Sequence, residues 1–110
     1  NYNAAKELLT DAIEMEPKNS MAHQYMGFTQ LRQKENAEAI KSYQMAVEAD
    51  ENDWMARKGL GVAYMLMALK EDITEQERDR NRALAVREWN VSLQIKPDQP
   101  KLRELVDRHQ

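Results

Sequence analysis

Residues 22–30 read AHQYMGFTQ and residues 56–64 read ARKGLGVAY, and the two stretches superimpose when the chain is shifted by 34 residues. The shift places Ala22 on Ala56 and Gly27 on Gly61. Small residues that return at the same spacing indicate a repeated packing arrangement. Repeats of about this length indicate stacked units of secondary structure, each of which buries its apolar face on the next.

The shift also relates the segments on either side of these two stretches. Under it, Ala5, Leu9 and Ala12 fall on Ala39, Tyr43 and Ala46. Residues spaced by three and four lie on one face of a helix. A face that alternates small and large side chains predicts helices that pack closely, with a ring against a glycine or an alanine.

Apolar spacing and capping residues together predict six helices. Pro17 ends the first, Asn19 or Ser20 and then Asp53 cap the second and fourth, and Thr74 with Glu77 forms the spacing of a capping box. The expected helices span about residues 2–15, 20–33, 37–49, 54–69, 75–95 and 100–106.

Composition narrows the class of protein. The chain has 110 residues, of which 42% are hydrophobic and 32% charged, and this suits one soluble globular domain. A net charge of −3 argues against a general nucleic-acid binder, and no apolar run is long enough to span a bilayer. We expect a soluble protein, with the cytoplasm slightly favoured. The chain opens within a helical pattern and without a methionine, so we expect it to be part of a longer protein.

The sequence offers no constellation for catalysis. It has no cysteine, and its only histidines, His23 and His109, lie far apart and outside any metal-binding spacing. The stretch GLGVAY lacks the third glycine of a dinucleotide-binding loop. We therefore predict a chain that is not an enzyme and that holds no cofactor or metal, with His23 as a packed ring.

These residues resemble the tetratricopeptide repeat (TPR), a helix-turn-helix unit of 34 residues. The second unit supplies His23, Met26, Gly27, Gln30, Ala39, Tyr43, Ala46 and Glu51 at the family's positions, and the third supplies Arg57, Leu60, Gly61, Tyr64, Ala85, Trp89, Ser92 and Pro97. Departures are local: His23 and Arg57 replace the usual aromatic residue, Gln30 the usual tyrosine, and Glu51 the usual proline.

The resemblance implies an all-α fold, a TPR-type α-solenoid of antiparallel helix hairpins with about two and a half repeats and a C-terminal capping helix. Residues 1–17 would be the second helix of a truncated repeat, and 18–51 a full repeat. Residues 52–97 would be a repeat with a 12-residue insertion near 70–82, and 98–110 the cap. All four segments would form a single domain.

The insertion is rich in charge, and Ile73 is its only apolar residue. The first interpretation is a solvated extension of the hairpin, with six extra residues in each helix projecting roughly 9 Å. The pairs Glu75–Arg78, Glu77–Arg80 and Asp79–Arg82 would stabilise it. The alternative is a docking knob specific to this protein.

In this family the first helices of successive repeats line a concave groove. By alignment, the expected groove residues here are Met21, Gln24, Phe28, Leu31, Met55, Lys58, Val62 and Met65. They suit a peptide or partner helix, although any one of them is as readily a core residue. Lys58 is the lone basic residue among them, which does not favour a clamp for acidic C-terminal tails.

The leading hypothesis is a noncatalytic adaptor that binds another protein in this groove. Two alternatives stay open: a module that forms homo-oligomers, or an accessory domain of a larger enzyme. Self-pairing would use the truncated N-terminal edge, where Tyr2, Leu8, Leu9 and Ile13 lack a preceding helix.

Overall fold

Four of the six helices begin at a residue whose side chain accepts a hydrogen bond from the first turn, and the other two begin without a side-chain cap. The Oδ1 atoms of Asn19 and Asp53 each accept a hydrogen bond at 3.0 Å, from the backbone N–H of Ala22 and of Ala56. Thr74 Oγ1 accepts one from the Glu77 N–H at 3.0 Å. The Glu77 carboxylate makes no return bond, so only half of the predicted capping box forms.

The computed structural model describes residues 1–110 and contains six helices and no strand, which confirms the predicted all-α fold. The helices are α1 (Tyr2–Met15), α2 (Ser20–Arg32), α3 (Asn36–Ala49), α4 (Trp54–Ala68), α5 (Glu75–Ile95) and α6 (Pro100–His109). The predicted bounds are correct to within one residue for most ends, since the caps and prolines that set them act locally.

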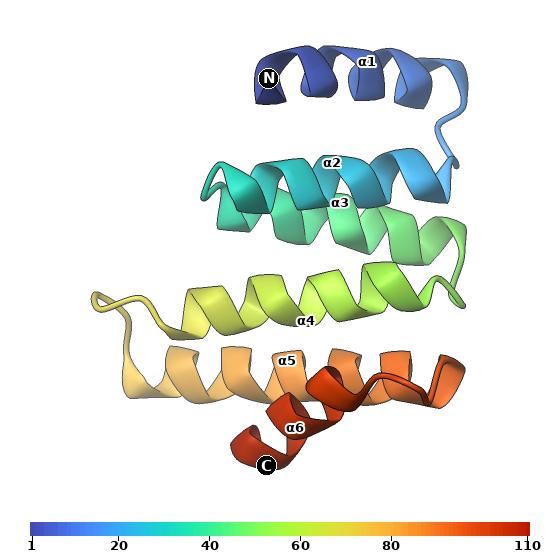
Figure 1. Ribbon diagram of the computed structural model, residues 1–110. Helices are drawn as coiled ribbons and strands as arrows, with labels where there is room; N and C mark the ends of the chain where they lie inside the picture. Colours follow the sequence, from blue (N-terminus) through green and yellow to red (C-terminus); the bar gives the residue numbers. More distant parts are fainter.

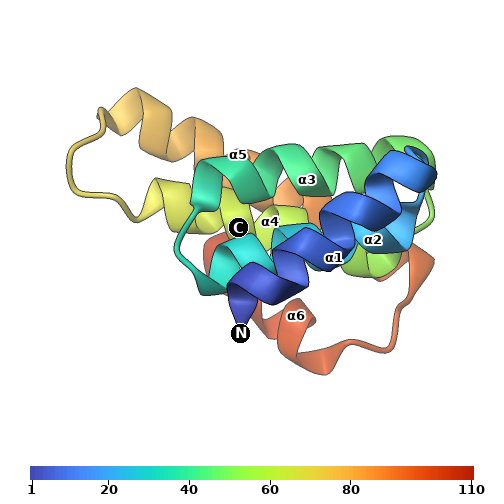
Figure 2. The same ribbon diagram turned by 90° about the horizontal axis from the view of Figure 1, so that it is seen from above.

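The first five helices stack in chain order, each antiparallel to the one before it (Figure 1). Seen from above, α3 and α5 lie along one side of the stack and α2 and α4 along the other (Figure 2). The last helix, α6, crosses α5 obliquely at the C-terminal end (Figure 1). The first, α1, packs against α2 alone and has no fully buried residue.

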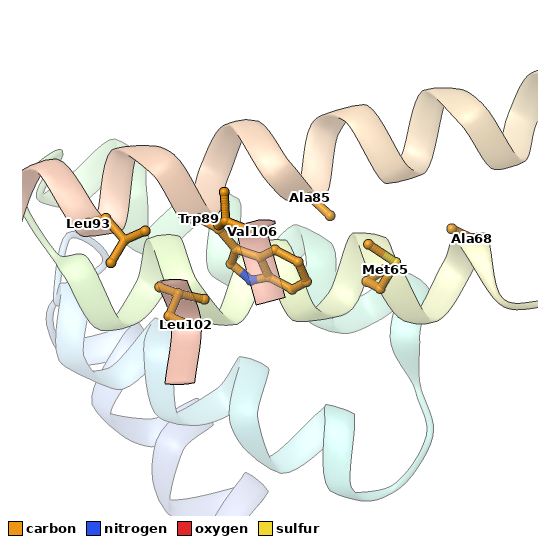
Figure 3. Close-up of a cluster of buried hydrophobic side chains, with 7 residues drawn as sticks. All are labelled: Met65, Ala68, Ala85, Trp89, Leu93, Leu102 and Val106. Atoms are coloured by element: carbon orange, nitrogen blue, oxygen red, sulfur yellow. The ribbon is translucent and has the colours of Figure 1, made fainter. Parts of the chain in front are cut away.

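Two clusters of buried apolar side chains hold the stack together. One joins α3 to α4 and consists of Ala39, Tyr43, Ala46, Ala56, Leu60 and Ala63. The other joins α4, α5 and α6 and consists of Met65, Ala68, Ala85, Trp89, Leu93, Leu102 and Val106 (Figure 3). Alanine is frequent in both clusters, and its small side chain lets the helix backbones approach closely.

Each cluster is centred on a ring that lies against glycine. The Tyr43 ring fills the space that Cβ atoms on Gly27 and Gly59 would need, and a Cβ atom added at Gly27 would lie 2.9 Å from the ring. Trp89 lies in the same way against Gly61, and its Nε1–H donates to the Lys58 carbonyl at 3.2 Å. The close approach predicted for Gly27 and Gly61 is thus present, and Gly59 adds a third.

Hydrogen bonds tie successive hairpins together at the same end of the stack. Ser20 Oγ lies 3.1 Å from the Ala46 carbonyl and 2.8 Å from Asp53 Oδ2, so it joins the start of α2 to the α3–α4 turn. Ser92 Oγ donates to the Trp54 carbonyl at 2.8 Å. The buried Gln99 amide donates to the backbone carbonyls of Ser92 and Lys96, and these bonds secure the start of α6.

The insertion differs from its predicted form. The expectation of six extra residues in each helix is wrong, because α4 has 15 residues against 13 in α2, whereas α5 has 21 against 14 in α3. Most of the extra length is therefore in α5 and in the loop before it. The segment is largely exposed, as expected for a solvated extension of the hairpin.

The three ion pairs predicted within the insertion are also absent. Only Lys6–Glu35 and Arg57–Glu88 form ion pairs in this structure. Arg78 instead donates to the backbone carbonyls of Ala68, at 2.6 Å, and Lys70, at 3.1 Å. Carbonyls at a helix end have no partner within the helix, and exposed ion pairs gain little in water, so the guanidinium binds the backbone.

A partly buried ion pair occupies an aromatic position of the repeat in the hairpin of α4 and α5. Arg57 Nη1 lies 3.0 Å from Glu88 Oε1, and the two side chains are 19% and 7% exposed. Arg57 stands where the repeat usually has a ring, and its counterpart His23 is buried, as predicted, with Nε2 2.8 Å from the Pro17 carbonyl. Each of these polar side chains can take the place of an aromatic ring because it has a hydrogen-bond partner within the chain.

We expect Gly61→Ala to lower the free energy of unfolding by about 1–2 kcal/mol. Crowding against Trp89 and the Ala85 carbonyl outweighs the gain of about 1 kcal/mol in helix propensity. Urea unfolding measures the change. In a Trp89→Phe background the same substitution should cost less, since the smaller ring leaves room for the methyl group. A Gly61→Ala chain as stable as the original would contradict the close packing.

We expect Glu88→Ala to cost at least about 2 kcal/mol, because it leaves the partly buried Arg57 guanidinium without its partner. Lys6→Ala is the matched control: its pair with Glu35 is more exposed, so its loss should cost less than about 1 kcal/mol. Chemical denaturation compares the two variants. Equal costs would show that the Arg57–Glu88 pair contributes no more than a surface pair.

Candidate functional site

A hollow of about 380 Å³ lies between α2 and α4, with α3 beneath it. Six of its nine lining residues are hydrophobic. The lining consists of Gln24, Tyr25, Phe28 and Leu31 from α2, Tyr43 from α3, and Met55, Lys58, Gly59 and Val62 from α4. Spacings of three and four residues along α2 and α4 turn these side chains toward the same face.

The rim of the hollow is formed by large apolar side chains that remain in contact with solvent. Phe28 is 54% exposed, Tyr25 49% and Met55 48%. Single exposed apolar residues are ordinary, but several around one hollow indicate a binding surface. The arrangement therefore offers apolar contact area that nothing within the chain covers.

Tyr43 forms the floor, and its surroundings make ionisation of its phenol even less favourable than usual. Burial raises the pKa of its phenol well above the usual range, and the nearby negative charge of Asp53 raises it further. Because Gly59 has no side chain, the ring edge reaches the hollow between α2 and α4. The floor of the hollow is therefore aromatic.

The structure brings six of the eight predicted groove residues to this hollow: Gln24, Phe28, Leu31, Met55, Lys58 and Val62. Met21 is 60% exposed but lies outside the lining. The expectation for Met65 is wrong: it is 8% exposed and belongs to the buried cluster around Trp89. Its repeat counterpart Leu31 stays at the hollow, whereas Met65 packs against side chains of α5 and α6.

Three lining residues were missed by the sequence reasoning: Tyr25, Tyr43 and Gly59. Tyr25 and Gly59 occupy the same repeat position, 34 residues apart. The alignment of the two repeats therefore already showed a large ring at this position in one repeat and no side chain in the next, and this difference could have identified both residues. Tyr43 was assigned only to the core, and its second role depends on the space left by Gly59.

Two further hollows adjoin the first. One lies between α1 and α2, shares Tyr25 and Phe28 with it, and is also lined by Leu8 and Leu9. The other lies toward the α2–α3 turn, shares Leu31, and is lined by Tyr2, Leu31, Arg32, Lys34, Asn36 and Leu66. We call the three adjoining hollows the trough.

The other large hollow of the surface is less apolar. It lies beside α5, has a volume of about 590 Å³, and has a mixed lining that includes Asp79, Arg82, Arg87 and His109. No group of three or more His, Asp or Glu side chains lies close enough together to hold a metal ion. None of the six helices combines the length and the apolar composition that crossing a membrane requires.

Comparison with known proteins agrees with the helical hairpin stack. A family model described as tetratricopeptide repeat matches residues 1–60, which comprise α1, α2, α3 and the first half of α4. No curated protein matches the sequence. Repeats of this family generally mediate protein–protein interaction and are typically noncatalytic. With more than half of its residues matched, the chain belongs to the tetratricopeptide repeat family.

Proposed function

We propose that this chain is a noncatalytic adaptor that holds a segment of a partner protein in the hollow between α2 and α4. The observation that carries the proposal is the half-exposed apolar rim of Tyr25, Phe28 and Met55 around a cavity of about 380 Å³. A cavity of this size accommodates one or two side chains of a bound segment.

Burial of this rim would supply the binding free energy. Each square ångström of apolar surface removed from water contributes about 25 cal/mol, before the cost of association is subtracted. Aromatic residues and methionine are enriched at the centres of protein interfaces. The flexible side chain of Met55 would adapt to the shape of the group that enters beside it.

The geometry favours a helical segment or a short extended peptide. A helix presents side chains at i, i+3, i+4 and i+7 on one face, and such anchors fit a groove between two helices. Apart from its two tyrosines, the lining has only Lys58 and Gln24 as polar side chains, so they would orient the segment rather than hold it by themselves.

Self-association is the second candidate, and α1 favours it. Leu8 is 72% exposed and Met15 88%, Tyr2 is 42% exposed, and Leu9 and Ile13 are half-buried. Pairing of α1 helices from two copies would cover these side chains. Light scattering at high concentration tests this proposal. If the original chain is a dimer and the Leu8→Glu variant is a monomer, the result supports pairing through α1. If the original chain is itself a monomer, the result counts against pairing.

The adaptor proposal is tested by selecting peptides from a displayed random library against the 110-residue chain. We expect selected peptides to lose at least tenfold in affinity for Phe28→Glu, because a buried unpaired charge would then face the apolar segment. Met45→Glu is the matched control, since Met45 is 45% exposed on α3 and lies outside the hollow. Fluorescence anisotropy of the labelled peptides measures both affinities.

Val62 is a poorer test position than Phe28, because it is half-buried and packs against the buried cluster around Trp89. Before the affinities are measured, circular dichroism is used to check that each variant keeps its helices. Peptides that bind Phe28→Glu as tightly as the original chain would place the binding surface elsewhere and contradict the proposal.

A further inference from the structure

The charges on the trough differ from those on the rest of the chain. The chain carries 19 acidic and 16 basic residues, for a net charge of −3. The trough is lined by three cations, Arg32, Lys34 and Lys58, and by no aspartate or glutamate. The charged side chains that line the trough are therefore all positive.

These three cations have no acidic partner within the chain. The two ion pairs of the structure involve Lys6 and Arg57. Arg32 donates through Nε to the Tyr2 hydroxyl at 3.3 Å, and its guanidinium lies 5.9 Å from the centre of the Phe28 ring. Its charge is thus held beside the apolar surface by uncharged neighbours. Lys34 lies in the tight turn after α2, where its backbone φ is 64°.

We infer that the segment bound in the trough is an acidic amphipathic helix, and this inference rests on the proposed function. Its apolar side chains would enter beside Phe28 and Met55, and its carboxylates would lie along the edges, near Lys58 and Arg32. Charge complementarity of this kind steers encounter and fixes register. A negatively charged segment would be repelled by the acidic remainder of the surface, which leaves the trough as the favoured place of contact.

The dimensions suit a short helix. The hollow between α2 and α4 and the hollow toward the α2–α3 turn follow one another along α4, from Met55 to Leu66, and this stretch of helix is about 17 Å long. A bound helix that lies along it needs roughly 11 residues, or three turns, at about 1.5 Å per residue. A helix of that length places carboxylates near both ends, where Arg32 and Lys34 lie toward one hollow and Lys58 borders the other.

The experiment uses two designed 18-residue peptides and the 110-residue chain. Both peptides carry leucine at helical spacing, and the remaining positions hold glutamate in one and lysine in the other. We expect the glutamate peptide to bind at least about tenfold more tightly in a fluorescence anisotropy titration at low salt. The ratio should shrink as salt is raised, because exposed charges are screened beyond about 8 Å at physiological ionic strength.

Substitution of the cations separates charge from apolar contact. The double variant Lys34→Gln/Lys58→Gln should bind the glutamate peptide about three- to tenfold more weakly and bind the lysine peptide no more weakly than before. Both lysines are exposed, so their replacement leaves the core unchanged. The control is Lys41→Gln, an exposed lysine of α3 that does not line the trough, and it should leave both affinities unchanged.

Several results would overturn the inference. Equal binding of the two peptides, or binding of neither, excludes an acidic segment as the occupant. The displayed library separates the two proposals. If the selected peptides need Phe28 for binding but have no excess of acidic residues, the adaptor proposal stands and the inference of an acidic segment is wrong. A failure to select any Phe28-dependent peptide would instead count against the adaptor itself.

A second copy of the chain is the remaining occupant to distinguish, since α1 is itself an acidic amphipathic helix with Glu7, Asp11 and Glu14. Light scattering separates this case. A dimer that dissociates in the Lys34→Gln/Lys58→Gln variant would show that α1 of another copy fills the trough, and the inference of a separate partner would fail.

Discussion

Packing of aromatic rings against glycine is the interaction on which the rest of the structure depends. Tyr43 lies against both Gly27 and Gly59, so one ring sets the distances between α2, α3 and α4. Trp89 does the same for α4 and α5 through Gly61. A helix glycine costs about 1 kcal/mol relative to alanine, and the close approach of a large buried ring offsets that cost.

The same ring connects the fold to the candidate site. Tyr43 is 3% exposed and belongs to the buried cluster between α3 and α4, yet it also forms the floor of the hollow. The hollow exists because α2 and α4 both pack on α3 while Gly59 contributes no side chain between them. A buried floor beneath the flexible side chain of Met55 gives a surface that keeps its position and adapts its outline.

Much of the architecture could be predicted from local signals. Asn19, Asp53 and Pro17 act on the residues beside them, so helix ends follow from the sequence almost residue by residue. The groove was predictable in part, since alignment to the repeat family assigned Phe28 and Met55 to the first helices that line it. Met65 shows the limit: its spacing matches Leu31, but contact with α5 and α6 buries it. Arg78 likewise binds carbonyls at the end of α4 that no sequence pattern indicates.

The sequence by itself determined the helices, their repeat and the faces that pack, because these depend on residues within a few positions of one another. Only the tertiary structure decided that Arg57 pairs with Glu88, that α5 carries most of the insertion, and that three cations line the trough without forming an ion pair. These features depend on distances between side chains far apart in the chain, and those distances are set once the rings meet the glycines.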